Sequence, residues 1–138
     1  MAKKSILFVD DEASLLHSLK RVLRPIDDDW HMAFTESASQ ALIMMELVPV
    51  DVVVSDMCMP QIDGLEFLQL VKEKYPVTVR VMMTGQFDYE VYREGTEISQ
   101  YFLWKPVQPS ALETLLQLLS KKEVKLGDAR QSDHDCGS

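Results

Sequence analysis

Short apolar runs of strand length alternate along this chain with longer segments whose apolar residues recur at helical spacing. The runs lie at 6–9, 30–34, 52–55, 77–83 and 101–104. The run that begins at Val52 has consecutive β-branched residues, which is typical of a strand covered on both faces. Five strand and helix units in succession predict an α/β fold, with parallel strands joined by right-handed crossovers in a doubly wound, three-layer sandwich.

The helical segments are bounded by recognisable stop signals. The first is predicted to follow Asp11 and to end before Pro25, and the second covers 37–47 before Pro49. The third follows the turn at 63–64 and ends near 75–76, and the last covers 109–121. From 87 to 100 the apolar spacing is irregular, and Gly95 interrupts what could be one short helix.

Length and charge limit the classes of function. The 138 residues, 46% of them apolar, predict one domain over 1–122 and a polar tail or linker over 123–138. The formal net charge of -8 disfavours direct binding to nucleic acid or to anionic lipids. No apolar run approaches the roughly 20 residues that a membrane span needs. Two cysteines are too few for a disulfide framework, so we expect a reducing, cytoplasmic location.

Polar residues stand at the ends of four of the predicted strands. Asp10 and Asp11 follow the first strand, Asp56 ends the third, Thr84 ends the fourth and Lys105 follows the fifth. The carboxyl ends of neighbouring parallel strands open into one crevice, so these residues should lie close together. Three carboxylates in one crevice repel each other unless a cation neutralises them. The sequence therefore predicts a Mg²⁺ site, because this ion prefers oxygen ligands and keeps room for phosphate oxygens.

The same residues fit phosphoryl chemistry. A carboxylate can attack phosphorus and form an acyl phosphate. Lys105 would place a positive charge beside the phosphoryl oxygens, and the Thr84 hydroxyl could donate a hydrogen bond to one of them. None of the three histidines (His17, His31 and His134) falls at a predicted strand end, so a catalytic triad or a zinc site is not expected.

Four segments carry a resemblance to a known family. They read ILFVDDE at 6–12, VVVSDMCMPQIDG at 52–64, MMTG at 82–85 and YFLWKP at 101–106. In this order they resemble the receiver domains of two-component response regulators, including single-domain chemotaxis regulators, over about 4–121. The resemblance implies a flavodoxin-like (βα)5 fold with strand order 2-1-3-4-5. It also implies a regulatory domain rather than an enzyme, with only self-catalysed phosphotransfer and autodephosphorylation.

The resemblance assigns roles around the acceptor. Asp56 would take a phosphoryl group from a sensor histidine kinase or a phosphotransfer protein. Asp11 and Asp56 would ligate Mg²⁺ directly, Asp10 would act through a water, and the backbone carbonyl of Cys58 would be a further ligand.

The resemblance also implies a switch. Lys105 and Thr84 would stabilise the phosphoryl group, and Phe102 would occupy the aromatic switch position beside Thr84. The peptide bond between Lys105 and Pro106 would be cis. Phosphorylation would change the surface of the fourth helix, fifth strand and fifth helix, which in relatives binds a partner or a second copy of the domain.

Part of the chain departs from the family pattern. The stretch between 86 and 100 lacks the common alanine-rich fourth helix. Gly85 and Gln86, followed closely by Asp88, resemble receivers attached to HD-type output domains, so such a domain in a longer chain is a possible partner.

Two other functions are compatible with the sequence. A metal-dependent aspartyl phosphatase would carry its nucleophile after the first strand and a second acid two residues on, which Asp10 and Glu12 fit poorly. A receiver-like adaptor that binds partners constitutively would not need all five site residues.

Overall fold

A computed structural model describes residues 4–57, 59, 62–85 and 89–121. The strands are β1 (Lys4–Val9), β2 (Trp30–Thr35), β3 (Val52–Asp56), β4 (Val79–Thr84) and β5 (Tyr101–Trp104). The helices are α1 (Ala13–Val22), α2 (Ala38–Leu47), α3 (Gly64–Lys74), α4 (Tyr89–Ile98) and α5 (Pro109–Lys121). All strand pairs are parallel and the order is β2-β1-β3-β4-β5, which confirms the predicted doubly wound α/β fold.

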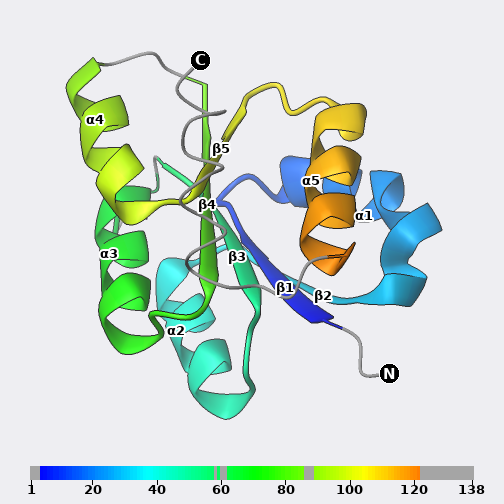
Figure 1. The fold of residues 1–138 in the computed structure, drawn as a ribbon, viewed down its shortest axis with the longest axis horizontal. Helices are drawn as coiled ribbons and strands as arrows, with labels where there is room; N and C mark the ends of the chain where they lie inside the picture. Colours follow the sequence, from blue (N-terminus) through cyan, green and yellow to red (C-terminus); the bar gives the residue numbers. More distant parts are fainter. Residues whose placement is uncertain (1–3, 58, 60–61, 86–88, 122–138) are drawn as a thin grey trace.

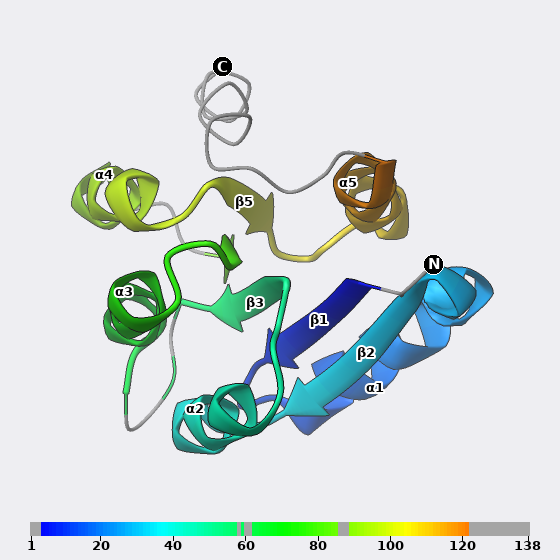
Figure 2. The same ribbon diagram turned by 60° about the horizontal axis from the view of Figure 1, so that its bottom comes forward.

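The sheet separates two apolar layers. Helices α1 and α5 cover one face, and α2, α3 and α4 cover the other (Figures 1 and 2). Because strand side chains alternate between faces, neighbouring residues of β1 enter different clusters. Phe8 packs with the leucines of α1 and α5, whereas Leu7 and Val9 pack with α2 and α3. Burial of both faces explains why β3 and β4 have no exposed residue.

Two helices begin where the sequence indicated. The side chain of Ser37 accepts a hydrogen bond from the Gln40 amide at 3.0 Å, and that of Asp63 accepts one from the Glu66 amide at 2.8 Å. Each side-chain oxygen satisfies an amide that has no partner within its helix. The predicted starts of α2 and α3 are therefore confirmed to within a residue.

One boundary was predicted wrongly. The fourth strand begins at Val79 rather than at residue 77, because the Thr78 amide bonds to the Tyr75 carbonyl in a turn and Val77 is 71% exposed. Helix α1 ends before Pro25, as predicted. The chain then forms a 3-10 helix, Arg24–Asp29, which leads directly into β2.

The irregular stretch before β5 forms a helix. Residues 89–98 are α4, and Gly95 lies within it rather than ending it. A Cβ at this position would come within 2.7 Å of Cζ of Phe102. The glycine is therefore explained by close packing against β5.

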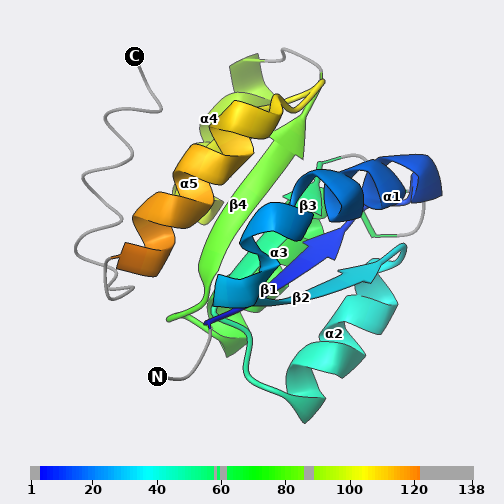
Figure 3. The same cartoon turned by 90° about the vertical axis from the view of Figure 1, so that its right-hand side faces the viewer.

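All strands point towards the same edge of the sheet (Figure 3). In the register, Val9 lies opposite Ser55, Asp56 opposite Met83, and Thr84 opposite Trp104. This edge therefore collects the residues that end β1, β3, β4 and β5. Within the described part of the chain, no helix has the length and apolar character needed to cross a membrane. The predicted tail, 123–138, lies outside the described residues.

Candidate functional site

Three carboxylates meet at the carboxyl edge of the sheet. One carboxylate oxygen from each of Asp10, Asp11 and Asp56 lies within 4.8 Å of the others. Asp10 is fully buried and Asp56 is 7% exposed, whereas Asp11 faces solvent. The prediction that residues 45 positions apart in the sequence lie close together is therefore correct. Their mutual repulsion must be offset by positive charge.

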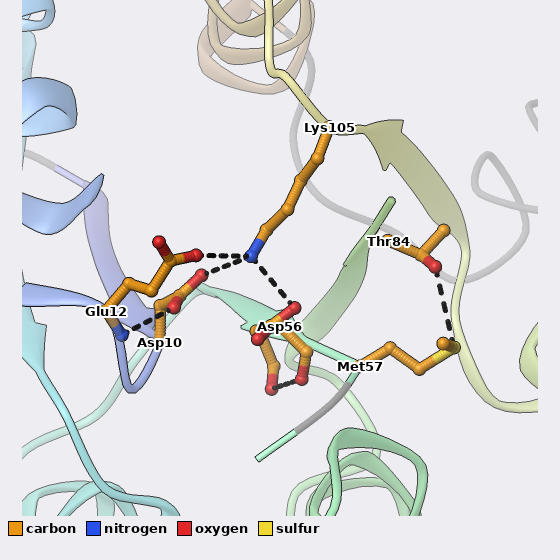
Figure 4. Close-up of polar contacts among 7 residues, drawn as sticks. Asp10, Glu12, Asp56, Met57, Thr84 and Lys105 are labelled. Carbon is orange, nitrogen blue, oxygen red and sulfur yellow. Dashed lines mark hydrogen bonds and ion pairs between the residues drawn. The ribbon is translucent and has the colours of Figure 1, made fainter. Parts of the chain in front are cut away.

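Lys105 supplies positive charge to this cluster (Figure 4). Its Nζ lies 2.9 Å from Oδ2 of Asp10, 3.1 Å from Oδ1 of Asp56 and 3.7 Å from Oε1 of Glu12. Burial by itself would lower the pKa of Lys105, but hydrogen bonds and charge attraction from Asp10 and Asp56 outweigh it and raise the pKa. The lysine therefore stays charged at neutral pH. Its peptide bond to Pro106 is cis, as the resemblance implied.

Asp10 does not act as the cap of α1. The N-cap residue is Glu12, whose side chain makes no capping bond. Instead, Oδ1 of Asp10 accepts a hydrogen bond from the Glu12 amide at 2.8 Å, while Oδ2 binds Lys105. Both oxygens of this buried carboxylate thus have partners, as a buried charge requires.

The segment after Asp56 is fixed by its backbone. The Met57 amide donates to the Met83 carbonyl at 2.9 Å, and the Met57 carbonyl accepts from the Gly64 amide at 2.7 Å. A Cβ at Gly64 would collide with the Asp56 carbonyl oxygen, so glycine permits this close approach. Met57 is therefore held against the start of α3. Cys58, whose carbonyl was a predicted metal ligand, lies outside the described residues.

The Thr84 hydroxyl is buried near the cluster but points elsewhere. Its Oγ1 donates a hydrogen bond to Sδ of Met57 at 3.6 Å, on the side away from Lys105 Nζ (Figure 4). The structure thus places Thr84 at the predicted strand end with its hydroxyl turned to a sulfur atom.

Phe102 is half-buried on β5, next to α4. Its ring lies against Gly95 and stacks with Trp104 at a centroid distance of 6.4 Å. Trp104 is 46% exposed, so the aromatic pair extends from the packed face of β5 to the molecular surface.

The donor set fits a hard divalent cation. Asp10, Asp11 and Asp56 offer only carboxylate oxygens, which Mg²⁺ prefers, and the exposure of Asp11 leaves one side open to water. When bound, such an ion supplies positive charge for phosphate oxygens.

Sequence reasoning missed two contacts of the site. Glu12 joins the Lys105 ion pairs, and Met57 accepts the Thr84 hydrogen bond. The position of Glu12 directly after Asp11 was a usable signal. A methionine next to Asp56 carried none, because in sequence it reads as ordinary core.

Comparison with known proteins agrees with this arrangement. Residues 6–117 match the family model of the response regulator receiver domain. The hydrogenase transcriptional regulatory protein HoxA of Cupriavidus necator is 31% identical over 94% of this chain, which corresponds to 27% of HoxA. The chain thus spans about a quarter of this curated relative.

Solved structures share the fold. The signal receiver domain of an HD domain-containing protein from Pseudomonas fluorescens Pf-5 is 26% identical, with a TM-score of 0.79 over 98% of this chain and 92% of that chain. The chemotaxis protein CheY4 of Vibrio cholerae is 28% identical, with a TM-score of 0.77 over 86% of this chain and 99% of that chain. With its acidic crevice and strand order, this chain belongs to the response regulator receiver domains, which are regulatory signalling domains.

Proposed function

We propose that Asp56 accepts a phosphoryl group from a histidine kinase or a phosphotransfer protein, in a reaction that needs Mg²⁺. The observation that carries this proposal is the position of Lys105 Nζ, which contacts the carboxylates of both Asp10 and Asp56. A positive charge at this place can bind the phosphoryl oxygens as they arrive, while the neighbouring carboxylates hold the metal.

The transfer needs one bond to form and one to break. An Asp56 carboxylate oxygen attacks phosphorus and forms an acyl phosphate, while the bond from phosphorus to the donor histidine nitrogen breaks and that nitrogen keeps the electron pair. Lys105 exchanges its contact with the Asp56 carboxylate for the phosphoryl oxygens. Its charge offsets the negative charge that the transfer brings into the crevice.

The acids divide the metal-binding roles. Asp11 and Asp56 would ligate Mg²⁺ directly, Asp10 would act through a water, and the Cys58 carbonyl would complete the protein ligands. The contacts that support this division are on Asp10, whose oxygens already bind Lys105 and the Glu12 amide. An acid engaged in this way is better suited to a water-mediated role than the exposed Asp11.

The switch would involve two further side chains. The Thr84 hydroxyl would turn to a phosphoryl oxygen, and the Phe102 ring would move into the space beside it. Phe102 lies against α4 in the structure, so its movement would alter the surface of α4, β5 and α5. That surface could then bind a partner or a second copy of the domain.

The partners follow from the family and its relatives. A histidine kinase would act on this domain in the cytoplasm. The similarity to a receiver from an HD domain-containing protein supports an HD-type output domain in a longer chain. The net charge of -8 argues against direct contact with nucleic acid or membranes.

Phosphorylation by acetyl phosphate tests the proposal. With Mg²⁺, the wild-type chain should gain one acid-stable, base-labile phosphoryl group that maps to Asp56, and chelation of the metal should abolish labelling. Asp56→Asn keeps the size of the side chain but removes the nucleophile, so it should remain unlabelled.

Labelling and beryllofluoride binding together separate the alternative functions. Label that survives in Asp56→Asn and is lost in Asp10→Asn, with rapid release of phosphate, would indicate an aspartyl phosphatase. A partner or dimer affinity that is unchanged by beryllofluoride, which mimics the phosphoryl group, would indicate a constitutive adaptor.

A further inference from the structure

The contact between Met57 and Thr84 joins the residue after the acceptor to the hydroxyl that is expected to bind the phosphoryl group. Oγ1 of Thr84 lies 3.6 Å from Sδ of Met57, and both side chains are buried. Figure 4 shows the hydroxyl directed to the sulfur and away from Lys105 Nζ. In this state the Lys105 contact with Asp56 is formed, but Thr84 is turned away from the crevice.

The backbone fixes the point from which the Met57 side chain extends. Met57 directly follows Asp56, and its amide and carbonyl are bonded to Met83 and Gly64. Its side chain belongs to the apolar cluster beneath α2 and α3. Packing in this cluster therefore restricts the thioether that accepts the Thr84 hydrogen bond.

We propose that Met57 is a positioning residue that helps to hold the Thr84 hydroxyl in its resting orientation and so contributes to the free-energy cost of the switch. The inference rests on the function proposed above. A thioether is a weak acceptor, whereas a phosphoryl oxygen is charged and strong. The sulfur can therefore satisfy a buried hydroxyl at rest and release it once a phosphoryl group is present.

The proposal has a consequence for ligand affinity. A ligand that needs Thr84 in the crevice binds with an apparent affinity reduced by the fraction of molecules in that state. Met57→Leu keeps the side-chain volume and removes the acceptor. It raises the free energy of the resting state and leaves the bound state unchanged. Affinity for the phosphoryl mimic should therefore rise.

A beryllofluoride titration of the whole 138-residue chain with Mg²⁺, followed by NMR amide shifts, measures this effect. Met57→Leu should bind roughly three- to tenfold more tightly than the wild type, the range expected from losing one weak hydrogen bond at rest. Met45→Leu is the matched control, because it makes the same change in the same apolar cluster but on α2. Its affinity should equal that of the wild type.

A double-mutant cycle separates positioning from packing. In a Thr84→Ala background there is no hydroxyl to hold, so Met57→Leu should no longer change the affinity. An equal gain in both backgrounds, or no gain with Thr84 present, would overturn the proposal.

The free protein gives a readout that does not depend on phosphorylation. Three-bond couplings of Thr84, measured without Mg²⁺ or beryllofluoride, should report one χ1 rotamer in the wild type and a larger population of the other rotamers in Met57→Leu. One unchanged rotamer in both proteins would refute the role of Met57. If the wild type failed to bind beryllofluoride, the proposed function would fail, while the couplings would still decide whether Met57 holds Thr84.

Discussion

Helices α4 and α5 precede and follow the same strand, β5, yet they are fixed to the sheet by different contacts. Helix α5 buries four leucines: Leu112, Leu115, Leu116 and Leu119. The described side chains of α4, residues 93–98, contribute only Gly95 and the half-buried Ile98 to the packed face. The carboxyl end of α4 is instead held through its carbonyls, since Lys72 Nζ bonds to Glu97 O at 2.9 Å and Arg80 Nε to Ile98 O at 2.6 Å.

The difference separates a fixed element from a more movable segment, residues 93–98 of α4. Apolar burial contributes a large and non-directional free energy, so any displacement of α5 is costly. Hydrogen bonds to carbonyls are directional and small in net effect, so a modest free energy can change the position of residues 93–98. The Phe102 ring touches Gly95 in this segment, which suits the proposed switch.

The strongest test of the comparison is in α5. Leu116→Ala removes a fully buried side chain and should lower the free energy of unfolding by about 2–5 kcal/mol in chemical denaturation. Leu118→Ala, in the same helix, is the control because Leu118 is 37% exposed, and it should cost below about 1 kcal/mol. Equal losses would show that the leucine face does not fix α5.

The next effect concerns Arg80, which is buried in β4 at 5% exposure. Its guanidinium also donates to the carbonyls of Thr78 and Pro76, and burial lowers its pKa. Arg80→Met leaves these acceptors without their donor. It should lower the free energy of unfolding by about 1–2 kcal/mol and speed amide exchange at the carboxyl end of α4. Arg80→Lys keeps the charge but not the planar fork, so it should restore only part of the loss. Unchanged exchange in α4 would contradict the role of Arg80.

The effect of Gly95→Ala on the free energy of unfolding should be smaller, and its sign should depend on whether Phe102 is present. In the wild type, Gly95→Ala would place Cβ 2.7 Å from Cζ of Phe102, and the overpacking should outweigh the gain in helix propensity, for a net loss of roughly 1 kcal/mol. In a Phe102→Ala background the collision with the ring is absent, and the flexible Met82 side chain, whose Sδ would lie 3.3 Å from Cβ, can give way. The same change should then raise the free energy of unfolding by up to about 1 kcal/mol. Stabilisation in both backgrounds would show that the ring does not rest on α4.

Lys72 should give the smallest effect. Its side chain is exposed, so Lys72→Met should cost roughly 0.5 kcal/mol, seen as slightly faster amide exchange in α4 and little change in global unfolding. A loss as large as that of Arg80→Met would mean that the exposed contact, rather than the buried one, secures the helix.

The same two helices show what could be predicted from the sequence. Helix α5 was predicted with its exact limits, because leucines at helical spacing record which face is buried. Helix α4 was not, because Gly95 lowers the helix propensity of this segment and its reason, the close approach of the Phe102 ring, is visible only in the folded chain. Arg80 within an apolar strand was the available sign that a charge lies beneath that helix.

The site likewise has features that the sequence could predict and one that it could not. Asp10, Asp11, Asp56 and Lys105 could be placed together because the ends of parallel strands converge. The orientation of the Thr84 hydroxyl could not, since it depends on tertiary contacts such as the one with the Met57 sulfur atom. Topology is encoded by patterns along the chain, whereas side-chain orientation depends on packing that only the folded molecule reveals.

A crystal structure of the chain with Mg²⁺ and beryllofluoride tests the central claim most directly. The account predicts one metal peak bonded to carboxylate oxygens of Asp11 and Asp56, with beryllofluoride on Asp56 and Lys105 Nζ against a fluorine. A metal bound away from Asp56, or beryllofluoride on another residue, would contradict the account.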